Sequence, residues 1–161
     1  MTIRNLFATC AAMALAVPAV AADVPFTASV GGVVCALFPV TPGQLAPDGD
    51  GDVLASTESG GVAGTLVATV AGGAALSVSD PTDWTLDPED AGGTAPATTT
   101  FDATVTGSGA TTFSELGDGD TAQSLANGVT NLTVDLSASA ATAFPAGTYR
   151  ADVTVTCEAA I

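Results

Sequence analysis

The sequence predicts an all-β protein, an exported chain that folds into one antiparallel, immunoglobulin-like β-sandwich. Three observations lead to this prediction. Apolar and polar residues alternate with a period of two through most of the chain after residue 22, between stretches rich in glycine, proline and aspartate. No stretch there repeats with the helical period of about 3.6 residues over several turns. An apolar leader opens the chain and has the features of an export signal.

The first 22 residues are organised like a secretory signal peptide. One positive charge, on Arg4, precedes an apolar stretch from Leu6 to about Val17. Val20 and Ala22 place small residues three positions and one position before a cleavage site that leaves Asp23 first. The apolar stretch is shorter than the roughly 20 residues of a membrane-spanning helix, although an uncleaved N-terminal anchor is the alternative.

We therefore expect residues 1–22 to be removed and residues 23–161 to form a single β-sandwich domain. A chain of that length suits one hydrophobic core. The expected location is outside the cytoplasm: secreted, in a periplasm or at a cell surface, with no membrane insertion after cleavage.

The composition is strongly acidic. Seventeen Asp and Glu residues oppose two basic residues, and the formal net charge is −15 at pH 7. This charge argues against nucleic acid and anionic membranes as partners, because both repel carboxylates. After residue 22 the chain has no histidine and no lysine, so the usual general bases and activated nucleophiles are missing. We expect a protein that is not an enzyme.

Two cysteines, Cys35 and Cys157, remain after the leader is lost together with Cys10. An even number of cysteines in an exported chain predicts a disulfide, here between the first and last core strands. A metal site is the competing interpretation. It has less support, because the chain has no histidine and no closely spaced cysteine pair.

The clearest strand is the last one, from Tyr149 to Cys157, where alanine, valine and the cysteine alternate with charged residues and threonine. The other expected strands cover residues 26–38, 64–71, 74–79, 101–105 and 132–136. Gly31-Gly32 is expected to bend the first of them. Residues 121–126 are the one candidate for a single helical turn.

The acidic loop Asp48-Gly49-Asp50-Gly51-Asp52 is the most distinctive local motif. Carboxylates on alternate residues of a glycine-rich loop can converge on Ca²⁺, so Asp48, Asp50 and Asp52 are candidate ligands for the one cofactor that the sequence suggests. Val53 and Ser59, however, stand where an EF-hand loop has glycine and a bidentate glutamate. A solvated acidic turn is the alternative, since Asp-Gly repeats form ordinary turns.

The start of the mature chain also alternates. Val24, Phe26, Ala28 and Val30 lie on one face of an extended segment. Such a segment can add a strand to the free sheet edge of another chain, and these four residues are our candidate strand-pairing residues. Alternatively, the segment completes its own sandwich as the first strand.

The segment 144–157, in which Ala146-Gly147-Thr148-Tyr149 leads into a strand rich in valine and threonine, resembles the closing strand of secreted bacterial β-sandwich subunits. Chaperone–usher pilins and the spore coat protein U family are similar in this respect. Residues 30–35, 41–45, 60–67 and 76–81 also resemble exported proteins of cyanobacteria. The likeness covers most of the mature chain through degenerate Gly, Thr and Val patterns. A bridge from Cys35 to Cys157 departs from pilins, whose disulfide usually joins early strands.

The resemblance implies a secreted structural or cell-surface subunit, pilin-like and polymerising through strand pairing. Its partners would be further copies of itself or other surface proteins. The alternative belongs to a different class, an extracellular adhesion or binding module that depends on Ca²⁺.

Overall fold

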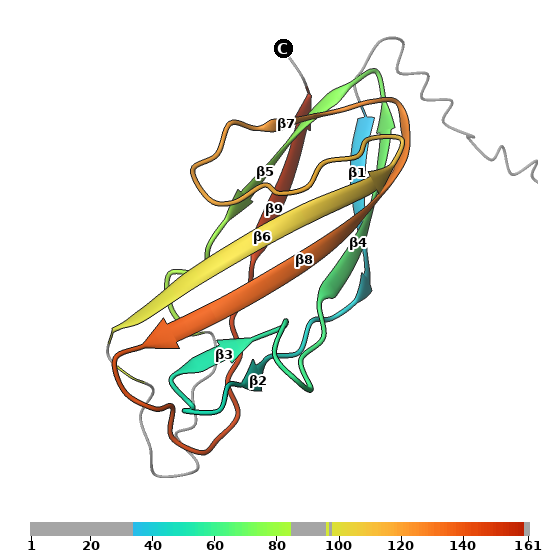
Figure 1. Ribbon diagram of the computed structural model, residues 1–161. Coiled ribbons are helices and arrows are strands. Elements are labelled where there is room, and N and C mark those ends of the chain that lie inside the picture. Colours follow the sequence, from blue (N-terminus) through green and yellow to red (C-terminus); the bar gives the residue numbers. More distant parts are fainter. Residues whose placement is uncertain (1–33, 85–95, 97, 160–161) are drawn as a thin grey trace, which may run out of the picture. The chain divides into compact units, whose positions relative to one another are not determined.

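The computed structural model describes residues 34–84, 96 and 98–159, and these residues form nine strands and no helix (Figure 1). The predicted all-β class is confirmed. The strands are β1 (Val34–Thr41), β2 (Ala46–Pro47), β3 (Val53–Ala55), β4 (Gly64–Ala71), β5 (Ala74–Ser79), β6 (Thr99–Gly109), β7 (Gln123–Leu125), β8 (Gly128–Ala140) and β9 (Thr154–Ala159). The leader and the alternating residues Val24, Phe26, Ala28 and Val30 lie outside the described residues.

The strands form two antiparallel sheets. In the larger sheet, β8 pairs with β6 along one edge, while β4 and β3 share its other edge. Beyond them, β1 pairs with β4 and β2 pairs with β3. In the smaller sheet, β5 lies between β7 and β9. Figure 1 shows β6 and β8 crossing in front of β5 and β9, so the two sheets form two layers.

Ser56 is buried and lies beside β8 at the point where the pairing of β8 changes from β4 to β3. The Ser56 backbone N–H donates to the Leu136 carbonyl, and the Leu136 N–H donates to the Ser56 hydroxyl oxygen. The hydroxyl in turn donates to the Asp135 carboxylate over 2.7 Å. Because all these polar groups find partners, the long strand keeps its hydrogen bonding across the junction.

Both sheets contribute to one hydrophobic core. Ala68 of β4, Leu76 of β5, Val105 of β6 and Leu132 of β8 are each no more than 1% exposed and belong to the same cluster. The period-two alternation seen in the sequence therefore reflects one face of each sheet turned toward the other. The shared core fits a sandwich, whereas the immunoglobulin-like topology and the single domain stay predictions.

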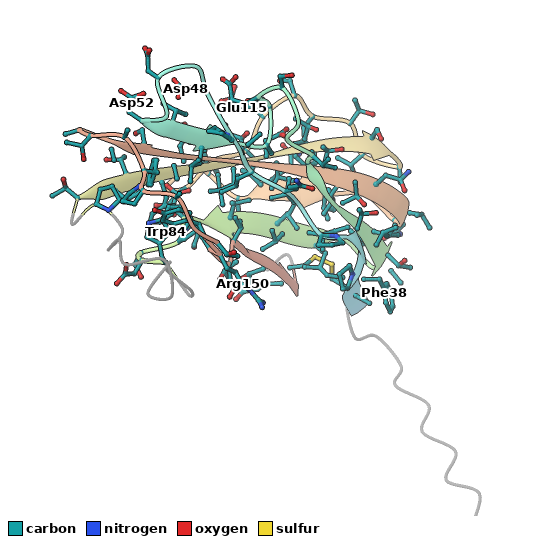
Figure 2. All side chains as sticks on the ribbon, turned by 90° about the horizontal axis from the view of Figure 1, so that it is seen from below. Phe38, Asp48, Asp52, Trp84, Glu115 and Arg150 are labelled. Atoms are coloured by element: carbon teal, nitrogen blue, oxygen red, sulfur yellow. A yellow bond between two sulfur atoms is a disulfide. The ribbon has the colours of Figure 1, made fainter. Side chains whose placement is uncertain are left out.

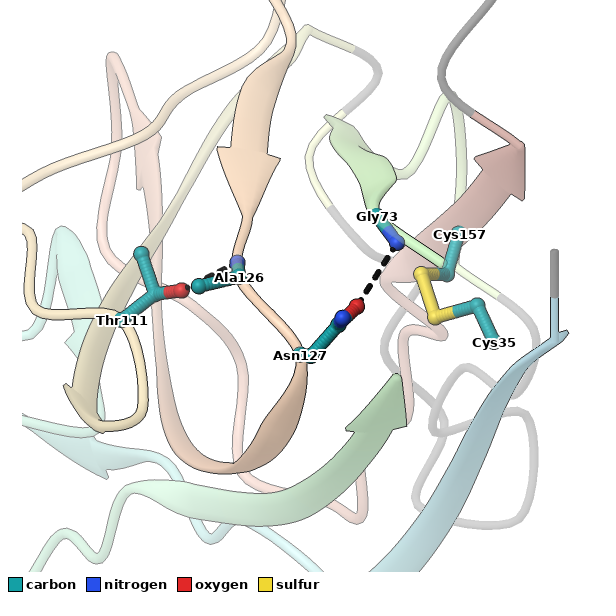
Figure 3. The surroundings of a disulfide bond; sticks show 6 residues. All are labelled: Cys35, Gly73, Thr111, Ala126, Asn127 and Cys157. Carbon is teal, nitrogen blue, oxygen red and sulfur yellow. Dashed lines mark hydrogen bonds between the residues drawn. A yellow bond between two sulfur atoms is a disulfide. The ribbon is translucent and has the colours of Figure 1, made fainter. Parts of the chain in front are cut away.

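The predicted helical turn at residues 121–126 is wrong, because β7 (Gln123–Leu125) lies there and pairs with β5. Leu125 is 2% exposed within the core. The side-chain oxygen of Asn127 accepts hydrogen bonds from the N–H groups of Gly72 and Gly73, which ties the end of β7 to the β4–β5 turn (Figure 3). Pairing with a distant strand thus overrides a weak local preference.

The last strand begins later than predicted, at Thr154 and not at Tyr149. Its partner β5 ends at Ser79, which pairs with Thr154, so no further residue of β5 is available to extend the ladder. The predicted alternation of faces nevertheless holds, because Ala151, Val153 and Val155 are half-buried while the residues between them are exposed.

The outer edge of β6 is covered by the loop that follows it. The N–H of Val105 donates to the Leu116 carbonyl, and the N–H of Gly107 donates to the Phe113 carbonyl. The Asp80 carboxylate accepts the N–H of Ala103 over 2.7 Å. An edge whose N–H groups are used in this way is a poor template for a further strand.

The predicted disulfide between Cys35 and Cys157 is present and joins β1 to β9, with the two Cα atoms 6.0 Å apart (Figure 3). It links the larger sheet to the smaller one. It also links the first described strand to the last, so it closes most of the described chain into one loop.

Removing the bridge should destabilise the fold strongly. The cysteines are separated by 122 positions, and chain-entropy reasoning gives a loss of about 4–5 kcal/mol for a loop of that length. We expect the Cys35→Ser/Cys157→Ser variant to show this loss in urea unfolding of the mature protein. A thiol titration of the denatured wild type without reductant should find no free cysteine; two free thiols per chain would contradict the bridge.

Candidate functional site

A groove of about 1020 Å³ opens between the end of β1 and the segment that leads into β9. Residues 39–45 contribute to its lining from one part of the chain, and residues between 144 and 155 contribute from another. We call it the β1–β9 groove. Its size is at the upper end of the range usual for ligand-binding pockets.

The groove reaches the hydrophobic core. Its lining includes five core-contacting side chains that are only half-buried, although residues further along β4 and β8, such as Ala68 and Leu132, are fully buried. These five are Leu66, Val134, Leu136, Val153 and Val155. In a completed two-sheet core such apolar side chains are close-packed on all sides. The β1–β9 groove therefore marks a place where the described residues leave the core uncovered.

Two strands that border the groove have a partner on only one side among the described residues. β1 pairs with β4 alone, and β9 pairs with β5 alone. Pro39 lies within β1, and proline is found in sheets mainly on edge strands because it has no N–H to donate. In β1, Phe38 is 55% exposed, and Val40, at the irregularity in register between Pro39 and Thr41, is 63% exposed.

The disulfide sets where the groove begins. From Cys35, four residues along β1 lead to Pro39, and from Cys157, two residues back along β9 lead to Val155. Pro39 and Val155 both line the groove. β1 and β9 are thus held together at the bridge and separate away from it (Figure 1).

A cluster of aromatic side chains supports the segment 144–149 beside the groove. The ring of Trp84 packs against Phe101 at 4.9 Å, Tyr149 at 5.0 Å and Phe144 at 5.8 Å between centroids. The indole N–H of Trp84 donates to Thr99. Since its ring is enclosed in this way, Trp84 serves to hold the connection between β8 and β9 in place.

The same connection is fixed by a local hydrogen bond. The Tyr149 hydroxyl donates to the Pro145 carbonyl, four residues upstream, over 2.8 Å. Tyrosines bonded back to the chain in this manner are common where a Greek-key sandwich passes from one sheet to the other. The wall of the groove formed by residues 144–149 is therefore held in shape.

One ion pair lies at the groove. Arg150 contacts Asp152 over 3.1 Å, with side chains 66% and 56% exposed, and both residues contribute to the lining (Figure 2). Arg150 is the one basic residue in the described part of the chain. Because Arg150 and Asp152 have opposite charges, the pair has no net charge. Exposed pairs of this kind contribute little to stability.

The predicted Ca²⁺ loop lies elsewhere, between β2 and β3 (Figure 2). The Asp48 carboxylate accepts the N–H of Gly51 over 2.6 Å and the N–H of Val53 over 3.4 Å, which makes it part of the turn itself. Asp50 is exposed and Asp52 is half-buried. Within the described residues, no three acidic or cysteine side chains are arranged to hold a metal ion. The Ca²⁺ hypothesis thus stays a prediction without support from geometry.

Sequence reasoning did not indicate the β1–β9 groove, because it arises from residues far apart in the chain. The predicted strand-pairing residues Val24, Phe26, Ala28 and Val30 lie outside the described residues. The described residues also contain no helix that is long and apolar enough to cross a membrane.

Comparisons with models of protein families, with curated proteins and with solved structures found no match for this chain. The likeness to pilins and to spore coat protein U therefore stays a prediction from the sequence pattern.

The role of Asp48 in the turn can be separated from Ca²⁺ binding. We expect Asp48→Ala to lower the free energy of unfolding by about 1 kcal/mol, because it removes a carboxylate that accepts backbone hydrogen bonds. Asp50→Ala, a matched change two residues away, should alter stability by less than about 0.5 kcal/mol. Urea unfolding measures both.

Thermal unfolding with millimolar Ca²⁺ tests the same loop for a metal site. We expect equal changes in Tm for the wild type and Asp50→Asn. Binding of Ca²⁺ at a specific site would instead stabilise the wild type alone, because only the wild type has the complete site. A larger rise in the wild type would favour the Ca²⁺ site and, with it, the Ca²⁺-dependent binding module.

Proposed function

We propose that the protein is a secreted structural or cell-surface subunit that associates with further copies of itself, or with other surface proteins, through strand pairing at the β1–β9 groove. The observation that carries the proposal is the groove itself: an apolar opening onto the core, bordered by two strands that, among the described residues, are paired on one side only.

The groove fits an extended chain better than a compact small molecule. Free strand edges offer unused backbone N–H and C=O groups in a regular row, which a second strand satisfies residue by residue. Alternate side chains of that strand would then enter the apolar opening beside Leu66, Val134 and Val155. The contrast with β6, whose N–H groups are already used, makes β1 the favoured edge.

Location outside the cytoplasm agrees with the proposal. The Cys35–Cys157 disulfide is typical of oxidising compartments, and the leader has the features of a signal peptide. The resemblance to pilins and to the spore coat protein U family implies the same kind of subunit. That the protein is not an enzyme stays an expectation from the missing histidine and lysine.

A charge at the groove should weaken association without unfolding the subunit. Val40 lines the groove at 63% exposure, and Val129 of β8 is 52% exposed outside it, which makes the two valines a matched pair. We expect Val40→Glu to weaken self-association of the mature protein at least about tenfold, because pairing would bury the new carboxylate. Val129→Glu should leave it unchanged.

Sedimentation velocity over a range of protein concentrations, with electron microscopy of the largest species, measures this association. Circular dichroism checks that both variants fold. If the wild type stays monomeric at every concentration, or if the two variants weaken association equally, pairing at the β1–β9 groove is contradicted.

A further inference from the structure

We propose that the β1–β9 groove takes an extended apolar segment that ends in a basic residue, supplied by a different protein in preference to a second copy. The inference rests on the proposed function, because it names the partner of the same groove. Charge complementarity carries it: the lining of the groove reaches into the acidic loop 48–52, and the chain has almost no basic residue of its own.

The lining of the groove follows β8 for the length of a short strand. Leu66 of β4 pairs with Leu132, and Leu54 of β3 pairs with Ala138, so these two lining residues lie six positions apart along β8. At about 3.4 Å per residue, that separation is about 20 Å. An extended segment of about six residues spans this length and directs every second side chain toward the apolar lining.

The acidic loop lies at the end of β8 that is remote from the disulfide. The loop leads directly into Val53, which pairs with Ser139 near one end of β8. At the other end of β8, Gly128 pairs with Val70, and Val70 also pairs with Cys35. A segment that lies along the groove and away from the bridge therefore approaches the acidic loop.

The acidic loop is attached to the wall of the groove and has carboxylates available for a partner. Gly51 lines the groove, and its carbonyl accepts the N–H of Phe144 over 2.8 Å. Asp50 and Asp52 flank this glycine, and neither side chain has a hydrogen bond or ion pair with any residue that the structure describes. The Asp48 carboxylate, in contrast, accepts backbone N–H groups of the turn. Two carboxylates beside the groove are thus available to a cation.

A second copy does not supply the matching charge. Arg4 and Arg150 are the two basic residues of the chain, and Arg4 belongs to the expected leader. Arg150 already contacts Asp152 over 3.1 Å. Any other segment of a copy brings to the acidic loop either no charge or further carboxylates, which the loop repels. A basic segment of a different protein gains electrostatic attraction in addition to apolar contacts.

Three peptides that differ only at their ends test the partner chemistry. Acetyl-Lys-Val-Thr-Val-Thr-Val-Lys-amide has alternating valines for the apolar lining and a lysine at each end, so either direction of binding brings one lysine to the acidic loop. The other two peptides have glutamine or glutamate in place of both lysines. In calorimetric titrations of the mature protein at about 20 mM salt, we expect the lysine peptide to bind at least about tenfold more tightly than the glutamine peptide, and the glutamate peptide to bind least tightly.

Salt and a further peptide separate the two parts of the interaction. At about 500 mM salt, the lysine and glutamine peptides should bind within about twofold of each other, because exposed charges are then screened over about 4 Å. A lysine peptide with threonine in place of every valine should bind at least about tenfold more weakly at low salt, since it lacks apolar side chains. If it binds as tightly as the valine peptide, charge alone explains the binding and the groove is not the site.

Two double variants test the position of the basic residue. Asp50→Asn/Asp52→Asn and Asp118→Asn/Asp120→Asn each neutralise two carboxylates around one glycine, so they change the net charge equally. Asp118 and Asp120 lie between β6 and β7, outside the lining of the groove. We expect the first variant to bind the lysine peptide at least about fivefold more weakly than the wild type, and the second to bind it within about twofold of the wild type. Circular dichroism checks that both variants fold.

Equal affinities for the lysine and glutamine peptides at low salt, equal losses in the two double variants, or no binding of any peptide would overturn the inference. If copies associate through the groove and the lysine peptide shows no preference, the proposed function stands and the inference falls. If the lysine peptide binds as expected and the wild type stays monomeric at every concentration, the inference stands and self-association falls.

Discussion

The Cys35–Cys157 bridge is the constraint on which the site depends. It joins β1, at one margin of the larger sheet, to β9, at one margin of the smaller sheet, and so fixes the distance between two strands that share no backbone ladder. Near the bridge the sheets cannot separate. Pro39, four residues from the bridge on β1, and Val155, two residues from it on β9, both line the groove through which the core is reached from outside. The same bond therefore fixes the position of the two described strands that border the groove.

The two outer edges of the larger sheet, β6 and β1, differ in whether other described residues accept hydrogen bonds from their N–H groups. On β6, the Asp80 carboxylate and the carbonyls of Phe113 and Leu116 take up successive N–H groups of the outer edge. On β1, no described residue does the same. A sheet with one covered edge and one open edge can add a strand on one side only, which is the condition for ordered association in place of indiscriminate edge-to-edge aggregation.

Much of the fold was predictable from the sequence because strand burial follows a period of two. The bounds of β4 and β5 agree with the alternation of their residues, and the pairing of Cys35 with Cys157 agrees with the prediction made from cysteine number and the expected export. What escaped prediction depends on distant partners. β7 forms because β5 lies beside it, and β9 begins where β5 ends. The β1–β9 groove was equally hidden, since it is bounded by residues about a hundred positions apart.

The net charge of this protein disfavours contact between two copies, whereas the apolar lining of the groove favours it. A net charge of −15 over 161 residues makes two copies repel, whereas the groove has an apolar floor and an ion pair, Arg150 with Asp152, that adds no net charge. Salt screens the repulsion between exposed charges over about 8–10 Å but leaves the burial of Leu66 and Val155 almost unaffected. We therefore expect the proposed association, if it occurs through the groove, to strengthen as ionic strength rises.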